Sequence, residues 1–247
     1  MIQSIIKRLL FVLMFTQFMI ISSECVNADF IFNGSEELTY IIHLNGKSYI
    51  EKTKASFVDD QLSYISEGNY VSPKVWEKGG PHQWDVKILK NGQPYLIQYS
   101  VAENVVRWSF DGKGRVCMNG IWDSNTCHDC KQFDTYVTVE TNYLIRHVNF
   151  VNNEQYIFNL IQLSELPKFK TYIMYFQWVG DEVVQVEAGE FHCKKILFSL
   201  KGFKGFFFKS FFYISNDAHR YIVKIDNLPI NGTTELIKAI YIPNKKN

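Results

Sequence analysis

Four cysteines are the residues of this chain with the most chemical options: Cys117, Cys127, Cys130 and Cys193. In an oxidising compartment an even set of cysteines favours disulfides, and four cysteines allow three pairings. We expect one bond to close the stretch Gly112–Lys131 and another to tie that stretch to Cys193. Two alternatives stay open, because Cys127 and Cys130 have the spacing of a redox pair and four thiolates could hold zinc tetrahedrally.

The other polar residues form no recognisable catalytic or metal-binding motif. The six histidines give neither His-x-x-x-His nor His-Glu-x-x-His, and Gly-x-Ser-x-Gly is absent from the sequence. Ser124 and His128 lie between Asp123 and Asp129, but a triad is recognised by its geometry in space and chance proximity in a polar loop is commoner. We therefore expect no catalytic residue, no metal and no cofactor.

The stretch Lys201–Tyr213, KGFKGFFFKSFFY, mixes six phenylalanines with three lysines. Lysines meet anionic headgroups and phenylalanines enter the acyl boundary, so contact with a membrane surface is one interpretation. The other is a buried strand preceded by a basic turn, which the β-rich composition favours. If the aromatic side chains line an unfilled half-barrel, they form an apolar pocket. The ligand contacts predicted on this basis are Trp84, Tyr99, Trp108, Phe198, Phe206 and Phe208.

The N-terminal segment Met1–Ala28 has the layout of a secretory signal. Lys7 and Arg8 precede an apolar run of 13 residues, and Val26-Asn27-Ala28 supplies a peptidase site. We expect cleavage before Asp29, leaving residues 29–247 as a single β-rich domain that is soluble in a bacterial periplasm. Lipidation of Cys25 is the alternative, and Glu24 before it disfavours that modification.

The balanced charge of the chain argues against nucleic acid as a partner, and its composition favours a β fold. Without residues 1–28 the chain has 24 basic and 24 acidic residues, whereas nucleic-acid binding needs a concentrated positive surface. The chain is rich in Tyr, Phe, Ile and Val, which suit a pleated, half-buried surface. These features favour a β protein that does not bind nucleic acid.

Turn dipeptides punctuate the apolar runs and predict an antiparallel meander, since Asn-Gly and Asp-Gly accept the positive φ of tight hairpins. They are Asn33-Gly34, Asn45-Gly46, Asn91-Gly92, Asp111-Gly112, Asn119-Gly120 and Asn231-Gly232. The clearest hairpin joins strands 182–187 and 191–199 through Ala188-Gly189-Glu190. Gly112–Lys131 is the least strand-like segment. About ten or more strands in one sheet cannot stay flat, so we expect an all-β fold, with minor α, whose single strongly curved antiparallel sheet forms a half-barrel or barrel.

The last third of the chain carries a family resemblance. Residues 184–194 read VQVEAGEFHCK, and Tyr213, Ser215, Asp217 and Arg220 precede the sequence Val-Lys-Ile at 223–225. These stretches resemble a family of exported bacterial proteins of unknown function that share a V-x-A-G-x-F hairpin followed by Y-x-S-x-D, R and V-x-I. The resemblance implies an architecture similar to that of periplasmic lipoprotein carriers and receptors, an open half-barrel around an apolar cavity. It brings no catalytic residue, and the cysteine-bearing insert near residue 120 departs from the pattern.

Three functions are consistent with these features. The first is a non-enzymatic exported periplasmic protein that binds a lipid, an acyl chain or another apolar ligand, or an envelope partner, on the concave face of the sheet. The second is a packed barrel that acts as a structural or assembly factor of the envelope. The third is a thiol-redox or metal-dependent enzyme that uses the loop from Cys117 to Cys130.

Overall fold

The computed structural model describes residues 34–58, 61–68, 82–89, 94–101, 104–110, 115–120, 123–129, 135–137, 145–146, 148–152, 154–162, 170–206, 208–228 and 231–243. The predicted signal segment Met1–Ala28, with Cys25, lies outside the described residues, as does Cys130. Within the described residues no helix is long and apolar enough to cross a membrane.

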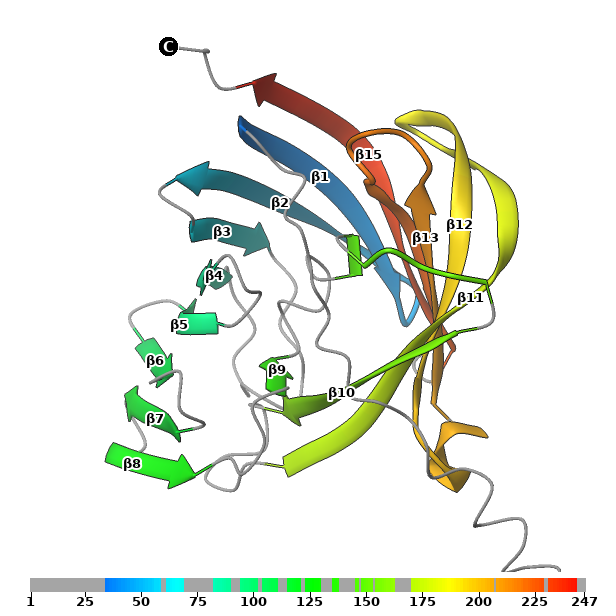
Figure 1. Ribbon diagram of the computed structural model, residues 1–247. Coiled ribbons are helices and arrows are strands. Elements are labelled where there is room, and N and C mark those ends of the chain that lie inside the picture. The colour runs from blue at the N-terminus through cyan, green and yellow to red at the C-terminus, as the bar shows by residue number, and fades with distance from the viewer. Residues whose placement is uncertain are drawn as a thin grey trace, which may run out of the picture.

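Fifteen strands of the described residues form one sheet (Figure 1). The first eight are β1 (Gly34–Leu44), β2 (Lys47–Val58), β3 (Gln61–Gly68), β4 (His82–Leu89), β5 (Pro94–Val101), β6 (Asn104–Phe110), β7 (Arg115–Gly120) and β8 (Asp123–Asp129). The others are β9 (Thr135–Val137), β10 (Gln155–Gln162), β11 (Lys170–Val186), β12 (Gly189–Leu200), β13 (Lys209–Ser215), β14 (Ile222–Asn227) and β15 (Gly232–Pro243), with a short 3₁₀ turn, η1, at Phe203–Phe206.

The sheet consists of two meanders joined side by side. Strands β1 to β8 follow one another, as do β10 to β15, and β15 pairs antiparallel with β1 to join the two series. Only β9 pairs in parallel among the described strands, with β10. Strands β8 and β9 form the two edges, so hydrogen bonds do not close the curved sheet of Figure 1 into a barrel. The predicted fold class, a strongly curved antiparallel half-barrel, is confirmed.

Two of the predicted turn dipeptides, Asn45-Gly46 and Asn231-Gly232, are confirmed at hairpin turns, whereas Asn33, Asn91-Gly92 and Asp111-Gly112 lie outside the described residues. Asn45 and Gly46 have φ values of 52° and 73° between β1 and β2, as a tight hairpin turn requires. Asn231 has a φ of 49° just before β15. The turn predicted at Asn119-Gly120 is shifted along the chain, because both residues belong to β7 and Gly120 forms the last pair of the hairpin with Asp123 of β8.

Two further predictions about local structure are corrected. The stretch Gly112–Lys131 contains β7 and β8, which pair with each other while β7 pairs with β6; pairing rather than apolar alternation makes them strands. The predicted strand 182–187 is the end of the longer strand β11, which continues through a bulge between Trp178 and Gly180. There the Trp178 indole N–H donates to the Gly180 carbonyl at 2.9 Å, which accommodates the additional residue.

The C-terminal half of the sheet packs against an aromatic cluster, which comprises Phe150, Phe158, Phe176, Phe198 and Phe212. The rings of Phe158 and Phe176 stack with their centroids 4.8 Å apart. Ile145 and Val148 belong to the same core, so the segment between β9 and β10 packs onto the sheet. The aromatic cluster and this segment therefore form the packed core on one face of the C-terminal half of the sheet.

Candidate functional site

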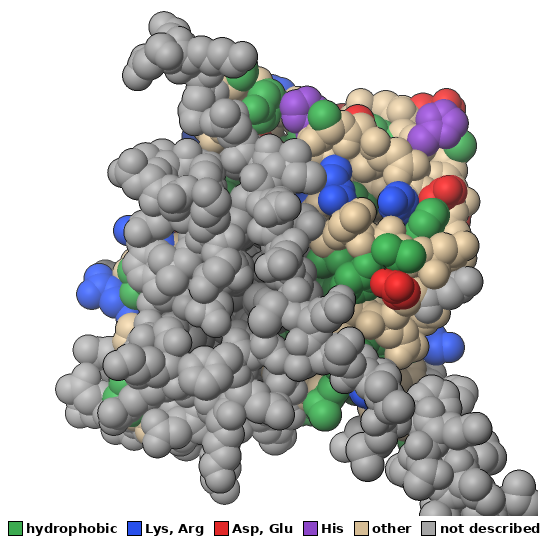
Figure 2. Space-filling view, viewed as in Figure 1, with side chains coloured by type: hydrophobic (Ala, Val, Ile, Leu, Met, Phe, Trp, Pro, Cys, Tyr) green, Lys and Arg blue, Asp and Glu red, His purple; other side chains and the backbone are tan. Residues whose placement is uncertain are grey.

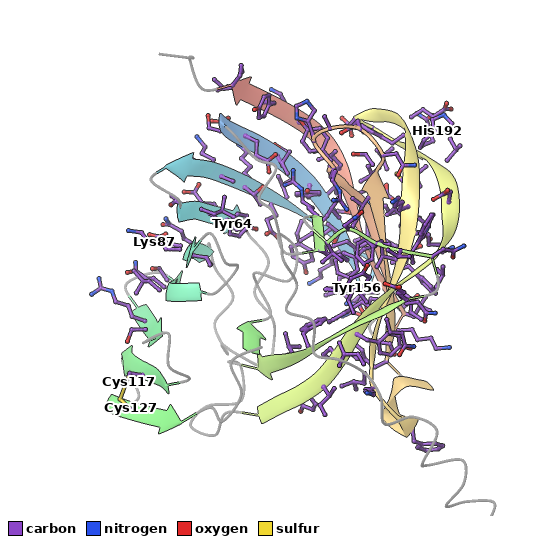
Figure 3. All side chains as sticks on the ribbon, viewed as in Figure 1. Tyr64, Lys87, Cys117, Cys127, Tyr156 and His192 are labelled. Atoms are coloured by element: carbon purple, nitrogen blue, oxygen red, sulfur yellow. A yellow bond between two sulfur atoms is a disulfide. The ribbon has the colours of Figure 1, made fainter. Side chains whose placement is uncertain are left out.

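The disulfide Cys117–Cys127 joins β7 to β8 (Figure 3). The two residues lie directly opposite each other in the antiparallel register, with Cα atoms 4.1 Å apart. The expected bond within Gly112–Lys131 is confirmed. Because both sulfurs are bonded to each other, Cys127 is not paired with Cys130 and four thiolates are not available for zinc.

The second predicted disulfide, to Cys193, is wrong. Cys193 carries a free thiol on β12 and is fully buried beside Val184 and Tyr213. Burial raises the pKa of this thiol to about 12, with smaller contributions from Asp217 and Glu182. A neutral, inaccessible thiol is a poor nucleophile and a poor metal ligand, so Cys193 is a core residue.

The described residues contain no group of three or more His, Cys, Asp and Glu side chains placed to hold a metal ion. Asp123, Ser124, His128 and Asp129 all belong to β8, an edge strand. Their side chains lie outside the described part of the structure, so the expectation that they form no catalytic triad stays a prediction.

The predicted ligand contacts fall into two groups. The backbone register sets Trp84 opposite Tyr99, and Trp108 opposite Ile97, but the side chains of Trp84, Tyr99, Trp108 and Phe206 are not among those described. Phe198 is a member of the aromatic cluster, and Phe208 packs edge-on against it with centroids 5.8 Å apart. The structure thus brings Phe198 and Phe208 together within packed core.

The stretch Lys201–Tyr213 divides between core and surface. Phe212 is buried and Phe208 is half-buried, as the strand interpretation predicts. Phe203, on η1, is 76% exposed, and the neighbouring Lys201 donates its backbone N–H to the carbonyl of Ile173 at 2.9 Å. Ile173 is itself 52% exposed, and its backbone lies beside that of Lys201. Figure 2 shows hydrophobic side chains with charged ones around them on the described part of one face.

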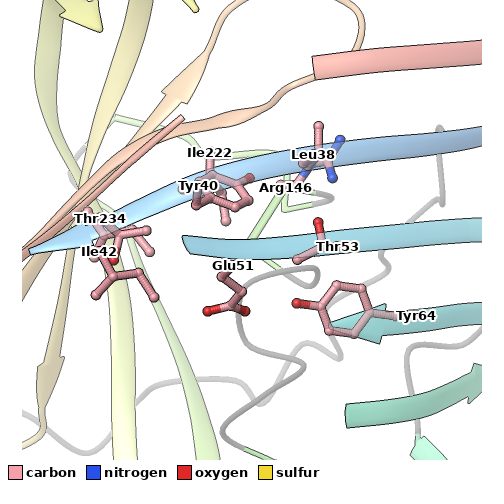
Figure 4. A pocket seen from close by; sticks show the side chains of 10 residues that line it. Leu38, Tyr40, Ile42, Glu51, Thr53, Tyr64, Arg146, Ile222 and Thr234 are labelled. Atoms are coloured by element: carbon pink, nitrogen blue, oxygen red, sulfur yellow. The ribbon is translucent and has the colours of Figure 1, made fainter. Parts of the chain in front are cut away.

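A cavity of about 80 Å³ opens among β1, β2, β3, β14 and β15, and we call it the Glu51 cavity (Figure 4). It is lined by Leu38, Tyr40, Ile42, Glu51, Thr53, Tyr64, Arg146, Ile222, Ile225 and Thr234. The register explains why these residues meet: Leu38 pairs with Thr53 and Tyr40 with Glu51 across β1 and β2. Since paired residues point to the same face, alternate positions of neighbouring strands supply one wall.

Two polar groups in this wall have too few hydrogen bonds to offset their loss of contact with water. Thr53 is 3% exposed, and its hydroxyl has no hydrogen-bond partner among the described residues. Glu51 accepts a hydrogen bond from the Ser66 hydroxyl, and burial raises the pKa of its carboxyl despite that bond. A buried hydroxyl without a partner costs about 1–3 kcal/mol, and a ligand group that hydrogen-bonds to Thr53 would remove this cost.

Two tyrosines complete the polar side of the cavity. Burial raises the pKa of both Tyr40 and Tyr64, and Glu51 raises each further through its negative charge. Both phenols are therefore neutral at physiological pH. Figure 4 shows the hydroxyl of Tyr64 directed toward Glu51.

Arg146 closes another side of the cavity and is tied into a buried ion pair. Its Nη1 and Nη2 atoms donate to the two carboxylate oxygens of Glu36, with Nη2 to Oε2 at 3.0 Å. Glu36 is 1% exposed, and both charges are removed from water. The same guanidinium donates to the carbonyls of His219, at 2.7 Å, and Arg220, at 2.9 Å.

The loop between β13 and β14 is shaped to receive Arg146. The Asp217 carboxylate accepts the backbone N–H groups of His219 and Arg220, at 2.8 and 3.0 Å. Arg220 has a φ of 51°, unusual for a non-glycine residue, and its guanidinium donates to the carbonyl of Val148 at 2.6 Å. Each side of the contact thus supplies an arginine to the backbone of the other. The Ser215 hydroxyl also accepts the backbone N–H of Tyr221, at 2.8 Å. Ser215, Asp217 and Arg220 of the Y-x-S-x-D and R stretch therefore have structural roles.

Sequence reasoning missed Glu36, Glu51, Thr53 and Arg146. For Glu36, Glu51 and Thr53, the alternation of apolar and polar residues along β1 and β2 indicates that the side chain faces inward. Glu36 stands in the alternating series Leu38, Tyr40, Ile42 and Leu44 of β1, and Glu51 and Thr53 alternate with exposed residues of β2. A polar residue at an inward position of a strand marks a buried polar site. Arg146 gives no comparable signal because its segment has no clear periodicity.

No family model matches the chain, and no curated protein matches it. Among solved structures, the β-barrel-like protein of the domain of unknown function DUF1849 from Brucella abortus is similar with a TM-score of 0.53 and 9% identity, over 85% of this chain and 98% of that chain. The hypothetical lipoprotein YmcC from Escherichia coli K12 has a TM-score of 0.36 and 11% identity, over 87% and 90% of the two chains. A DUF1329 family protein from Desulfovibrio piger has a TM-score of 0.35 and 11% identity, over 90% and 92%. The first likeness identifies the fold of this chain as β-barrel-like.

Proposed function

We propose that this chain is an exported, non-enzymatic binding protein of the bacterial envelope, whose half-barrel takes the polar end of an amphiphile in the Glu51 cavity. The observation that carries the proposal is the buried Thr53 hydroxyl, which has no partner among the described residues and lines a cavity with one polar and one apolar side. A valine has nearly the same shape and would avoid the penalty of the unpaired hydroxyl. A ligand that hydrogen-bonds to the hydroxyl would explain why a threonine is present at this position.

The walls of the cavity suit an amphiphile. Leu38, Ile42, Ile222 and Ile225 supply apolar surface, while Glu51 and Thr53 offer hydrogen-bonding groups on one side. Ligand sites are commonly apolar with a few polar groups that fix orientation. Each methylene buried on such a surface contributes about 0.8 kcal/mol.

The volume of the cavity limits which part of the ligand enters it. About 80 Å³ is room for a small group, whereas a site that encloses a drug-sized molecule measures about 300–1,000 Å³. The proposal therefore places a head group in the cavity and the apolar tail along the concave face beyond it.

Two features support export. Met1–Ala28 has the layout of a secretory signal. The disulfide between Cys117 and Cys127 suits an oxidising compartment such as the periplasm. A contact with the membrane surface through Lys201 and Phe203 would let such a protein exchange its ligand with a bilayer, and the exposure of Phe203 favours it.

A packed-barrel assembly factor is the second candidate. The aromatic cluster and the segment at Ile145–Phe150 favour it, because they occupy concave surface that a long ligand would need. The two candidates differ in whether the purified protein carries an amphiphile.

The test is to purify the chain from the periplasm, examine it by native mass spectrometry, and extract it with organic solvent. Added decylamine, 1-decanol and sodium decanoate are then compared for their effect on the melting temperature. The proposal predicts an extractable amphiphile and a higher melting temperature with at least one of the three compounds. An empty protein that none of them stabilises contradicts binding and favours the packed-barrel factor.

A further inference from the structure

The charge balance around the Glu51 cavity is uneven. Arg146 lines the cavity, but its charge is matched by Glu36 through two hydrogen bonds. The ion pairs found among the described residues do not include Glu51. When Glu51 is ionised, these three groups together carry one uncompensated negative charge.

The groups next to Glu51 offer lone pairs and aromatic faces. The Thr53 hydroxyl oxygen has no described partner, and a hydroxyl oxygen accepts hydrogen bonds. Tyr40 pairs with Glu51 across β1 and β2, Tyr64 lines the same cavity, and Figure 4 shows the hydroxyl of Tyr64 directed toward the Glu51 carboxyl. The π faces of tyrosine attract cations, and their neutral phenol oxygens are acceptors as well.

These properties distinguish between possible head groups. A carboxylate or phosphate would meet the Glu51 carboxyl, while the guanidinium of Arg146 is already occupied by Glu36 and two carbonyls. A neutral alcohol would leave the charge imbalance in place. A primary ammonium supplies one positive charge and three N–H donors, which match one carboxylate and neighbouring hydroxyl oxygens.

We propose that the Glu51 cavity binds a primary ammonium group carried on an apolar tail, with Glu51 as its counter-ion and Thr53 as a hydrogen-bond acceptor. This inference rests on the proposed function, since it names the head group of the amphiphile. An aliphatic amine and an amine-bearing lipid share this chemistry. Both place the ammonium group at the polar wall and the chain against Leu38, Ile222 and Ile225.

The test compares three probes of equal chain length, decylamine, 1-decanol and sodium decanoate, by isothermal titration calorimetry at pH 7 and below their aggregation concentrations. The proteins are wild type, Glu51→Gln and the control Glu37→Gln. Glu37 is an exposed carboxylate of β1 that pairs with Lys54 at 3.0 Å and lies outside the cavity lining. Thr53→Val is a second cavity variant, in case Glu51→Gln does not fold.

We expect decylamine to bind wild type at least tenfold more tightly than decanol and decanoate. Glu51→Gln should weaken decylamine at least thirtyfold, Thr53→Val several-fold, and Glu37→Gln less than twofold. Equal or tighter binding of decanol or decanoate, or decylamine binding unchanged by both cavity variants, overturns the ammonium site and leaves the binding function standing. Absence of binding by all three probes overturns both. A phosphatidylethanolamine vesicle then separates a lipid source from a free amine, since only a lipid ligand is extracted from it.

Discussion

Glu36 of β1 and Arg146 of the segment before β10 lie 110 positions apart in the chain and form a buried, two-pronged ion pair. The contact fixes the segment Ile145–Phe150 against the first strand, and the carbonyls of His219 and Arg220 hold it from the other side. One guanidinium thus connects three parts of the chain beside the Glu51 cavity.

Replacing Arg146 by methionine should destabilise the protein by about 3–5 kcal/mol, because the buried carboxylate of Glu36 loses its partner. Urea denaturation followed by tryptophan fluorescence measures the loss. The matched control is Lys54→Met, which breaks the exposed pair between Lys54 and Glu37 and should change the free energy of unfolding by less than about 1 kcal/mol. Equal effects of the two variants would show that the Arg146 pair does not hold the fold.

The stability of wild type relative to Glu51→Gln should depend on pH. Folding raises the pKa of Glu51 above its ordinary value of 4.5, mainly through burial, so the unfolded state loses this proton first as pH rises. The stability that Glu51 contributes is therefore greatest below pH 4.5 and is lost as pH rises through the folded-state pKa. The melting temperature of Glu51→Gln minus that of wild type should be near zero at pH 4 and positive at pH 8. A difference that stays constant between these values would contradict a raised pKa.

Alternating residues and turn chemistry suffice to predict the sheet. The hairpin at Asn45-Gly46 and the long hairpin of β11 and β12 follow from two-residue periodicity and from residues that accept positive φ. Strands β7 and β8 could not be predicted in this way. Their sequence lacks apolar alternation, and a neighbouring strand and a disulfide hold them.

The residues that line the cavity were harder to predict from the sequence than the fold. The sequence predicts an apolar pocket lined by Phe198 among other aromatics, yet Phe198 belongs to packed core, and the Glu51 cavity is lined by two tyrosines together with Glu51 and Thr53. Those two residues alternate correctly with their neighbours, so they could have been identified as inward-facing polar positions. Glu36 pairs with Arg146. Arg146 lies in a segment without clear periodicity, so its position next to Glu36 could not be predicted from the sequence.

Cys193 should be unreactive in the folded protein, since it is buried and its pKa is raised to about 12. The measurement uses a chain that begins at Asp29 and carries Cys130→Ser, so that Cys193 is its only unbonded cysteine. A thiol reagent should find no reactive thiol in buffer and one per chain in urea. Prompt reaction in buffer would contradict the buried position, and three thiols in urea without reductant would contradict the disulfide between Cys117 and Cys127.

Phe203 should contribute to binding at a membrane surface, because it is 76% exposed beside a lysine. Removing the ring in Phe203→Ser should weaken association with vesicles that contain anionic lipid by about tenfold, as expected for losing one inserted aromatic side chain. Vesicle co-sedimentation measures it. Val183→Ser, which removes an exposed apolar side chain from β11, is the control and should have little effect. Equal binding by both variants and wild type would exclude Phe203 as a membrane contact.

Thr53 gives the most direct test of a head group in the Glu51 cavity, since stability and binding should change in opposite directions. Thr53→Val removes a buried, unpartnered hydroxyl at nearly constant shape, so the ligand-free variant should melt above wild type, by about 2–4 °C for each kcal/mol of the penalty removed. Native mass spectrometry of both proteins purified from the periplasm should find a bound amphiphile on wild type and much less on Thr53→Val. The control is Thr233→Val, because Thr233 lies on β15 and is not among the residues that line the cavity. Full occupancy of Thr53→Val, or an empty wild type, would contradict the account.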